Sequence, residues 1–180
     1  MDMHGTVTLK GDRIILRRYS VEDINVLYED LGLDIKMYEF SGWNPYKTPE
    51  MTAATVEKYI CSYNDAAFYG WAVESEGRLI GTVGAYDYNE AENSAELGIS
   101  ISRRYWNKGY GSEALDMVIK YLTEVEDIGL LKAWCAADNK GSRKAMENCG
   151  MKLKSIEKNG LAVGENVYDK LNFEYTADRD

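Results

Sequence analysis

The chain is poor in histidine, because His4 is the only one among its 180 residues. Serine and cysteine nucleophiles are commonly activated by a histidine base, and histidine is a frequent ligand of catalytic zinc. A Ser-His-Asp hydrolase, a Cys-His protease and a histidine-rich zinc site are therefore disfavoured. Any proton transfer must use carboxylates, hydroxyls, lysines or water.

Cysteine and long apolar segments are also scarce. The three cysteines, Cys61, Cys135 and Cys149, are an odd number without metal-ligand spacing, which is typical of reduced thiols in a cytoplasmic protein. No segment approaches the roughly 20 apolar residues of a membrane span. The first ten residues lack the basic and apolar regions of a secretory signal. We expect a cytoplasmic protein that uses no metal and binds no membrane.

Basic residues are outnumbered, with 21 Lys and Arg against 30 Asp and Glu, a net charge of −9. This charge repels nucleic-acid phosphates and attracts a cationic acceptor, such as an amine or a basic peptide. The alternative is that the acidity only keeps the protein soluble. A hydrophobic content of 45% over this length is enough for one well-buried domain.

The periodicity of apolar residues predicts one mixed α/β domain. We expect helices at residues 20–31, 32–40 and 49–64, after residue 109 and at 141–148, and strands at 13–19, 68–88 (a hairpin turning at Glu76-Gly77), 94–101, 130–136, 151–157 and 163–173. Strands 94–101 and 130–136 flank a helix, so a right-handed crossover should make them parallel. The remaining strands should be antiparallel.

The most informative segment, residues 101–122, reads ISRRYWNKGYGSEALDMVIKYL. Gly109 and Gly111 have no Cβ, so a ligand can lie against the backbone there. The helix that follows has one apolar face, made by Leu115, Val118, Ile119 and Leu122. Its first N–H groups have no intrahelical partner and carry partial positive charge, which favours a phosphate or pyrophosphate. A simple tight turn is the alternative interpretation of the two glycines.

Six stretches in this order resemble the GNAT N-acetyltransferase superfamily, especially its Rim-type branch of ribosomal-protein N-terminal acetyltransferases. They are RIILR at 13–17, LIGTVG at 79–84, AELGI at 95–99, YWNKGYGSEA at 105–114, DNKGS at 138–142 and NCGM at 148–151. Trp106 departs from the Gln or Arg that usually begins the acyl-CoA motif. The resemblance covers about residues 12–173 of a single domain spanning 1–180. It implies an α/β (α+β) fold with a mixed, mostly antiparallel sheet of six to seven strands, a central parallel pair and helices on both faces.

The resemblance also implies acetyl-CoA as cosubstrate. The pantetheine arm would lie between the splayed parallel strands and pair with backbone at Leu97 and Ile99. Asn139 would bond a pantetheine amide, unless it only caps the next helix. Lys108 would add a charge beside the pyrophosphate, unless it is a solvated loop lysine. The pyrophosphate would be held by the amides of Lys108, Gly109, Tyr110, Gly111 and Ser112.

The reaction implied by the family is direct attack of a primary amine on the thioester, without an acyl-enzyme. A chain N-terminus, with a pKa of about 7.7–8.0, loses its proton near neutral pH for under about 1 kcal/mol, whereas a lysine-like amine requires about 4 kcal/mol at pH 7.4. An N-terminal acceptor therefore needs little beyond positioning and a modest base. Glu96 is the favoured base, because it is the carboxylate beside the acyl group and faces opposite Leu97 and Ile99. An exposed or salt-bridged glutamate is the alternative.

The remaining site residues are assigned from the same resemblance. Ser142 follows Asn139 by three positions and matches a proposed acid near the sulfur, although it is also a candidate helix cap. Trp43 and Asn44 in an aromatic early loop, together with Tyr168, are candidates for the acceptor wall, with core packing as the alternative for both aromatics.

We expect an acetyl-CoA-dependent N-acetyltransferase acting on a protein or peptide N-terminus, as a monomer or homodimer. The alternatives are acetylation of a small polyamine or aminoglycoside-type amine, or a non-catalytic acyl-CoA-binding module.

Overall fold

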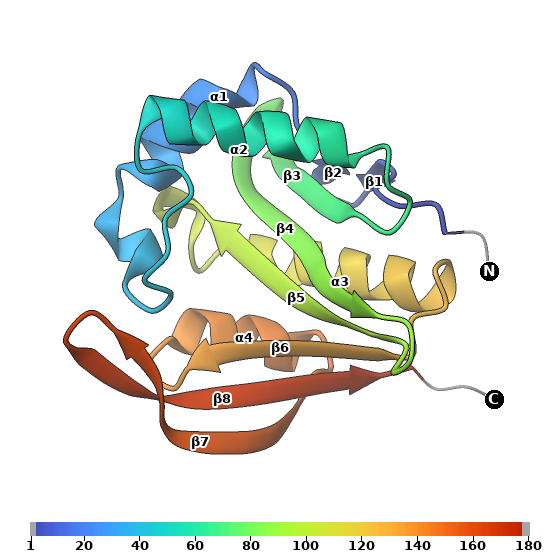
Figure 1. The fold of residues 1–180 in the computed structure, drawn as a ribbon, viewed down its shortest axis with the longest axis vertical. Coiled ribbons are helices and arrows are strands. Elements are labelled where there is room, and N and C mark those ends of the chain that lie inside the picture. The colour runs from blue at the N-terminus through green and yellow to red at the C-terminus, as the bar shows by residue number, and fades with distance from the viewer. Residues whose placement is uncertain (1–2, 178–180) are drawn as a thin grey trace.

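An eight-stranded sheet runs through the protein, seen in a computed structural model that describes residues 3–177 (Figure 1). Its strands are β1 (Leu9–Lys10), β2 (Ile15–Arg17), β3 (Tyr69–Ser75), β4 (Arg78–Asn89), β5 (Ser94–Ile101), β6 (Leu130–Ala136), β7 (Lys152–Val163) and β8 (Asn166–Thr176), in the order β1-β2-β3-β4-β5-β6-β8-β7. The helices are α1 (Asp23–Val26), α2 (Pro49–Ser62), α3 (Tyr110–Glu124) and α4 (Lys140–Asn148), with short π or 3₁₀ turns η1 (Leu27–Gly32), η2 (Ile35–Tyr38) and η3 (Arg103–Tyr105).

The sheet opens at its centre. Strands β5 and β6 are the parallel pair, and their register joins Ser94 to Leu130, Ala95 to Leu131 and Glu96 to Lys132. Beyond these three pairs the described residues of β5 and β6 do not pair with each other, although β6 stays paired with β8 as far as Ala136. Figure 1 shows the two strands diverging toward their C-terminal ends. The backbone edges in this gap are therefore available to another hydrogen-bonding chain.

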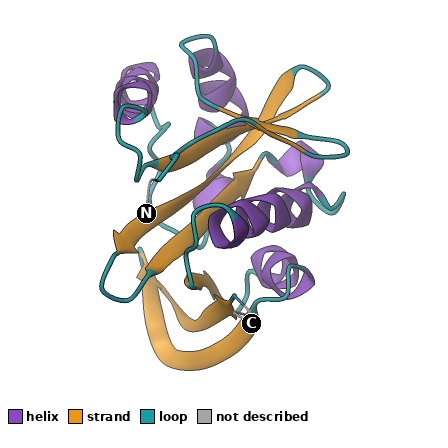
Figure 2. Cartoon of the chain, turned by 90° about the vertical axis from the view of Figure 1, so that its right-hand side faces the viewer, coloured by secondary structure: helices purple, strands orange, loops and turns teal. Residues whose placement is uncertain are grey.

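Helices cover both faces of the sheet (Figure 2). The apolar stripe of α3 is buried, as the sequence predicts, and packs in the main core with the inward side chains of β3, β4, β5 and β6. A second, smaller core lies on the other face. It contains Leu27 and Leu31 of η1 and Val56 of α2, packed with Ala72 and Leu79 of the sheet. The two faces of β5 thus differ, with Leu97 toward α3 and Glu96 toward the side of α1 and α2.

Most predicted elements are confirmed. The bounds of β5 and β6 agree with the sequence analysis, and α2 begins at Pro49 with Thr48 as its cap, whose Oγ1 accepts from the N–H of Met51 at 3.2 Å. The predicted first helix starts later than expected, at Asp23. The carboxylate of Asp23 accepts from the N–H of Ser20 at 2.9 Å, which is half of a capping box.

Two predictions of strands are wrong. The sheet has eight strands rather than six or seven, because Leu9–Lys10 adds a short edge strand beside β2. The final hairpin turns near Gly164, not between residues 157 and 163. The polar segment at residues 158–160 resembles a turn in sequence. It forms a bulge instead, with Asn159 at φ 54° and its N–H donating to Asp169 Oδ1 at 3.0 Å.

The close packing of β4 against β5 at Gly81 can be tested by substitution. A Cβ added at Gly81 would lie 2.3 Å from the backbone oxygen of Ser100 and 2.7 Å from Ile101 Cδ1. Because a ladder backbone must move to relieve this contact, we expect Gly81→Ala to lower the free energy of unfolding by about 2–3 kcal/mol in urea denaturation. Gly141→Ala is the control, since its Cβ would meet Asn139 Oδ1 at an ordinary 3.8 Å. Equal losses in both variants would contradict the steric argument.

Candidate active site

Residues 108–112, the glycine elbow, lead into and form the start of α3. Gly109 has φ 83°, a left-handed conformation that favours glycine, and it precedes the helix without a side-chain cap. Within residues 3–177, no hydrogen bond joins the N–H groups of residues 108–112 to a protein acceptor. Five consecutive free donors at the positive end of a helix dipole suit a pyrophosphate, so the residues present fit the group that the family motif implies.

Arg13 fastens this elbow to the rest of the fold. Its Nη1 donates to the carbonyl of Lys108 at 2.8 Å, its Nε donates to Glu113 Oε2 at 2.8 Å, and its guanidinium lies 4.7 Å from the centre of the Tyr110 ring. Lys108 itself lies in the loop with its Nζ 5.5 Å from the Tyr105 ring. These contacts hold cationic groups beside the free amides. The sequence analysis did not select Arg13, whose partners are about a hundred residues away.

The gap between β5 and β6 begins after the pair Glu96–Lys132. Leu97 is buried against the α3 side and Ile99 is partly buried in the same core, so their side chains point away from the face that carries Glu96. The backbone of β5 at these two positions has no partner on β6. An extended ligand can therefore pair with main-chain groups there, as an added strand does.

Glu96 lies at the apex of the gap, on the last residue pair before the strands part. Its Oε1 accepts a hydrogen bond from Trp134 Nε1 at 3.0 Å. It makes no ion pair with a residue of the described range 3–177, which removes the salt-bridged alternative. Glu96 and Trp134 also border a hollow of about 300 Å³ on the face away from α3. A half-buried carboxylate with one engaged oxygen is thus exposed to a ligand at the apex.

The start of α4 lies beside the diverging end of β6. Asn139 is the cap, because its Oδ1 accepts from the N–H of Ser142 at 3.1 Å. The alternative role of Ser142 as the cap is therefore wrong. The hydroxyl of Ser142 and the Nδ2 of Asn139 make no hydrogen bond with other described residues, so both remain available to a ligand.

Two cysteines lie near this region, and burial raises the pKa of both Cys135 and Cys149 to about 11. Each thiol is therefore neutral at physiological pH, and Cys149 Sγ donates to the carbonyl of Ser112 at 3.1 Å. Cys61 is exposed on α2, outside the elbow and the gap. Neither buried cysteine has the thiolate character that a covalent acyl carrier needs.

The early loop around residues 40–47 contacts the hairpin of β7 and β8. The ring of Phe40 packs edge-on against Tyr168 of β8, with centroids 5.3 Å apart, and a Cβ on Gly42 would lie 3.1 Å from Val163 Cγ1. Trp43 is 67% exposed, so the alternative of core packing is wrong for this residue.

Asn44 lies in the same loop and holds its shape. Its Nδ2 donates to the carbonyl of Gly32 at 2.8 Å, and its Oδ1 accepts from the N–H of Tyr46 at 2.9 Å. Because both polar atoms of the amide bond backbone groups, Asn44 stabilises the conformation of this loop.

Tyr86 is a site residue that the sequence analysis missed. It pairs directly with Glu96 across β4 and β5, so the two side chains share the face away from α3. Its ring lies across two glycines, since a Cβ on Gly98 would be 2.9 Å from Tyr86 Cε2 and one on Gly84 would be 2.9 Å from its hydroxyl. The available signal was a glycine two positions before the aromatic residue, with a second glycine directly opposite the first across β4 and β5.

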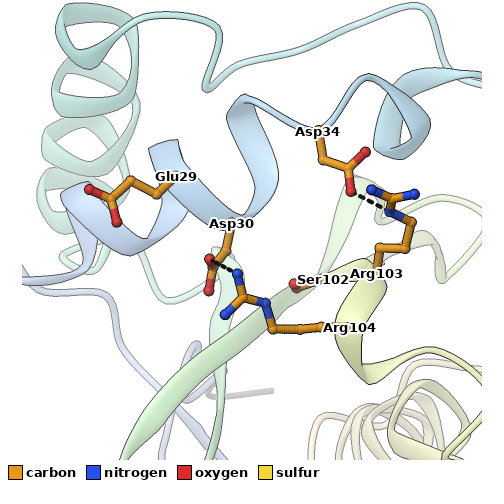
Figure 3. Close-up of a pocket in the computed structure, with 6 residues that line it drawn as sticks. All are labelled: Glu29, Asp30, Asp34, Ser102, Arg103 and Arg104. Carbon is orange, nitrogen blue, oxygen red and sulfur yellow. Dashed lines mark hydrogen bonds and ion pairs between the residues drawn. The ribbon is translucent and has the colours of Figure 1, made fainter.

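A second hollow, of about 390 Å³, separates the early helices from the turn after β5 (Figure 3). Asp30 of η1 is buried there and accepts from Arg78 at 2.7 Å and from Arg104 at 2.8 Å. Asp34, at the start of η2, pairs with Arg103 at 2.7 Å. The pairs with Arg103 and Arg104 tie η1 and the start of η2 to the turn that leads into the elbow.

Of the helices in residues 3–177, none is long and apolar enough to cross a membrane. The same residues contain no group of three or more His, Cys, Asp and Glu side chains placed to hold a metal ion. The expectations that no metal, membrane or nucleic acid takes part stay predictions.

Comparison with known proteins places this chain in a family. The family model described as Acetyltransferase (GNAT) domain matches residues 13–152. The N-acetyltransferase p20 of Bacillus licheniformis, itself uncharacterized, is 25% identical over 160 residues, covering 86% of this chain and 84% of the relative.

Solved structures agree on the fold. RimL, a ribosomal L7/L12 α-N-protein acetyltransferase in complex with coenzyme A, superposes with a TM-score of 0.87 at 16% identity, covering 97% of this chain and 100% of RimL. MccE, a microcin C7 self-immunity acetyltransferase in complex with acetyl-CoA and AMP, gives 0.84 at 16% identity, covering 93% and 94%.

The Asp30 cluster gives a test of what holds η1 and η2 to the turn after β5. We expect Asp30→Asn to lower the free energy of unfolding by about 2 kcal/mol, because a buried charge-assisted pair is lost while the arginines remain partly solvated. Asp34→Asn, which breaks a more exposed pair, should lower it by less than about 1 kcal/mol. Urea denaturation at low and high salt measures both. A larger loss for Asp34→Asn would show that the tie lies elsewhere.

Proposed function

The chain belongs to the GNAT family of acetyltransferases, and from that premise we propose that it transfers an acetyl group from acetyl-CoA to a protein or peptide N-terminal amine. One observation carries the proposal: the five free N–H groups of residues 108–112 at the start of α3, beside the parting of β5 and β6. We assign a single acetyltransferase domain to residues 1–180, with the family resemblance over about residues 12–173. We place its activity in the cytoplasm, where its three free cysteines stay reduced.

The cosubstrate is assigned to the gap and the elbow together. The N–H groups of residues 108–112 would hold the pyrophosphate, and Lys108 would add a positive charge beside them. The pantetheine arm would pair with the backbone at Leu97 and Ile99. Asn139 would donate from Nδ2 to a pantetheine carbonyl, because capping α4 occupies only its Oδ1. When bound, the thioester supplies the activated acyl group.

Proton transfer is assigned to two side chains at the apex. Glu96 would take the proton from the attacking amine, directly or through one water, since its Oε2 makes no hydrogen bond with a described residue. Ser142 would donate from its free hydroxyl toward the leaving sulfur. The neutral, buried Cys135 and Cys149 support direct attack by the amine rather than an acyl-cysteine.

The acceptor is assigned to the face that carries Glu96 and Tyr86. Tyr168 and Trp43 would form the wall, with Asn44 keeping the loop in place. Aromatic side chains beside polar loop backbone suit a peptide end, and an N-terminal amine requires only a modest base. The net charge of −9 favours a second candidate, a small polyamine or aminoglycoside-type amine. A non-catalytic acyl-CoA-binding module is the third.

Gly109 gives the direct test of the pyrophosphate assignment. Gly109→Asp should weaken acetyl-CoA binding by more than roughly 100-fold in calorimetry, because a carboxylate would repel the phosphates among the free amides. Gly109→Asn is the matched control, since it brings a side chain of the same size and a similar tolerance of φ 83° without the charge, and it should weaken binding much less. Unchanged affinity in Gly109→Asp removes the assignment. Equal losses in both variants would attribute the effect to backbone strain.

The acceptor class is tested by turnover on a matched panel. We expect release of CoA with peptides that have a free N-terminus, at a kcat/KM more than roughly 100-fold above that of the same peptides with a formylated N-terminus and an internal lysine. Spermidine and an aminoglycoside complete the panel. Turnover confined to those two amines would make the second candidate the function. Acetyl-CoA binding without turnover on any amine would favour the non-catalytic module.

A further inference from the structure

Trp134 stands at the point where the two parallel strands separate. It lies on β6, two residues after Lys132, the last residue of β6 that pairs with β5. Its indole Nε1 donates to Glu96 Oε1 at 3.0 Å, so a side-chain hydrogen bond crosses between the strands just after the backbone bonds end. Both residues border the same hollow. The indole is therefore the one described donor that holds the Glu96 carboxylate.

The ring of Trp134 is itself held from the next strand. Lys170 of β8 places its Nζ 5.2 Å from the centre of the Trp134 ring, within the range of a cation–π contact. Asn172 is the direct partner of Trp134 in the β6–β8 register and lines the same hollow. Asn172 is fixed in turn by bonds to Ser155 and Glu157 of β7. The orientation of the indole thus depends on the final hairpin.

We propose that Trp134 is a positioning residue for acetyl transfer, which acts by holding one oxygen of Glu96 and leaving the other to accept the proton of the amine. This inference rests on the proposed role of Glu96 as base. A carboxylate with two free oxygens on a flexible side chain samples many orientations, whereas an N–H bond to Oε1 fixes the plane in which Oε2 lies. Fixed orientation of a base raises the rate of proton transfer without changing cosubstrate binding.

The variant Trp134→Phe removes the N–H donor and keeps an aromatic ring for Lys170. We expect kcat to fall roughly 10-fold, the size of one lost charge-assisted hydrogen bond, with the KM for acetyl-CoA changed less than roughly twofold. Replacement of Trp134 by benzothienylalanine, which has the shape of tryptophan with sulfur in place of N–H, should give the same loss. This second variant keeps the test valid if the smaller ring of phenylalanine disturbs folding.

A double-mutant cycle with Glu96→Gln separates positioning from packing. We expect Glu96→Gln to lower kcat by roughly 100-fold or more, and we expect Trp134→Phe to have no further effect in that background. A Trp134→Phe loss that persists in the Glu96→Gln background overturns the proposal, as does an unchanged kcat in Trp134→Phe alone. An unchanged kcat in Glu96→Gln instead removes the base assignment, and with it the role of Trp134.

Trp71→Phe is the matched control for losing an indole hydrogen bond. Trp71 is buried on β3, and its Nε1 donates to the carbonyl of Val7 at 2.6 Å, on the α3 side of the sheet and outside the site. We expect Trp71→Phe to lower the melting temperature and leave kcat unchanged per folded molecule. A kcat loss as large as that of Trp134→Phe would mean that losing any buried indole bond slows the enzyme, and it would overturn the specific role of Trp134.

Discussion

The parting of β5 and β6 after three residue pairs is the constraint on which the whole site depends. A paired sheet satisfies its own backbone groups, and only a place where pairing stops offers main-chain donors and acceptors to a ligand. Here the stop coincides with three other features: a carboxylate at the apex, a left-handed glycine at the far end of β5, and a helix whose first amides are free. Because β6 remains paired with β8 along its length, the gap does not weaken the sheet as a whole.

Charge imposes a second constraint, since an acidic protein must attract a polyanionic cosubstrate. A net charge of −9 opposes the approach of phosphates at long range, but solvent ions screen that field over about 8 Å at physiological salt. Attraction must therefore be local. In the proposed site the free amides of residues 108–112 would supply it together with Lys108 and Arg13, and the carboxylate of Glu113 holds Arg13 in place. The same overall acidity would favour the cationic amine that is proposed as acceptor.

The sequence predicted those parts of the fold in which neighbouring residues decide the outcome. The alternation of Leu97 and Ile99 with Glu96 gave the correct bounds and faces of β5, and Thr48 with Pro49 gave the correct start of α2. The sequence-based prediction failed where one local pattern is compatible with two backbone structures. The Asn-Gly at residues 159–160 suits both a turn and a bulge, and the pairing of the long final hairpin selects the bulge. The short edge strand β1 exists only because β2 offers it an edge.

The sequence by itself determined which chemistry is present: a glycine elbow before an amphipathic helix, a strand glutamate, and almost no histidine. The tertiary structure alone decided which side chains act together. Arg13 reaches the elbow from about a hundred residues away, Trp134 reaches Glu96 from a neighbouring strand, and Tyr86 lies over glycines of its own strand and the next. Contacts of this kind depend on strand register and on the face each side chain occupies, and no local propensity of the chain encodes the distance between two strands.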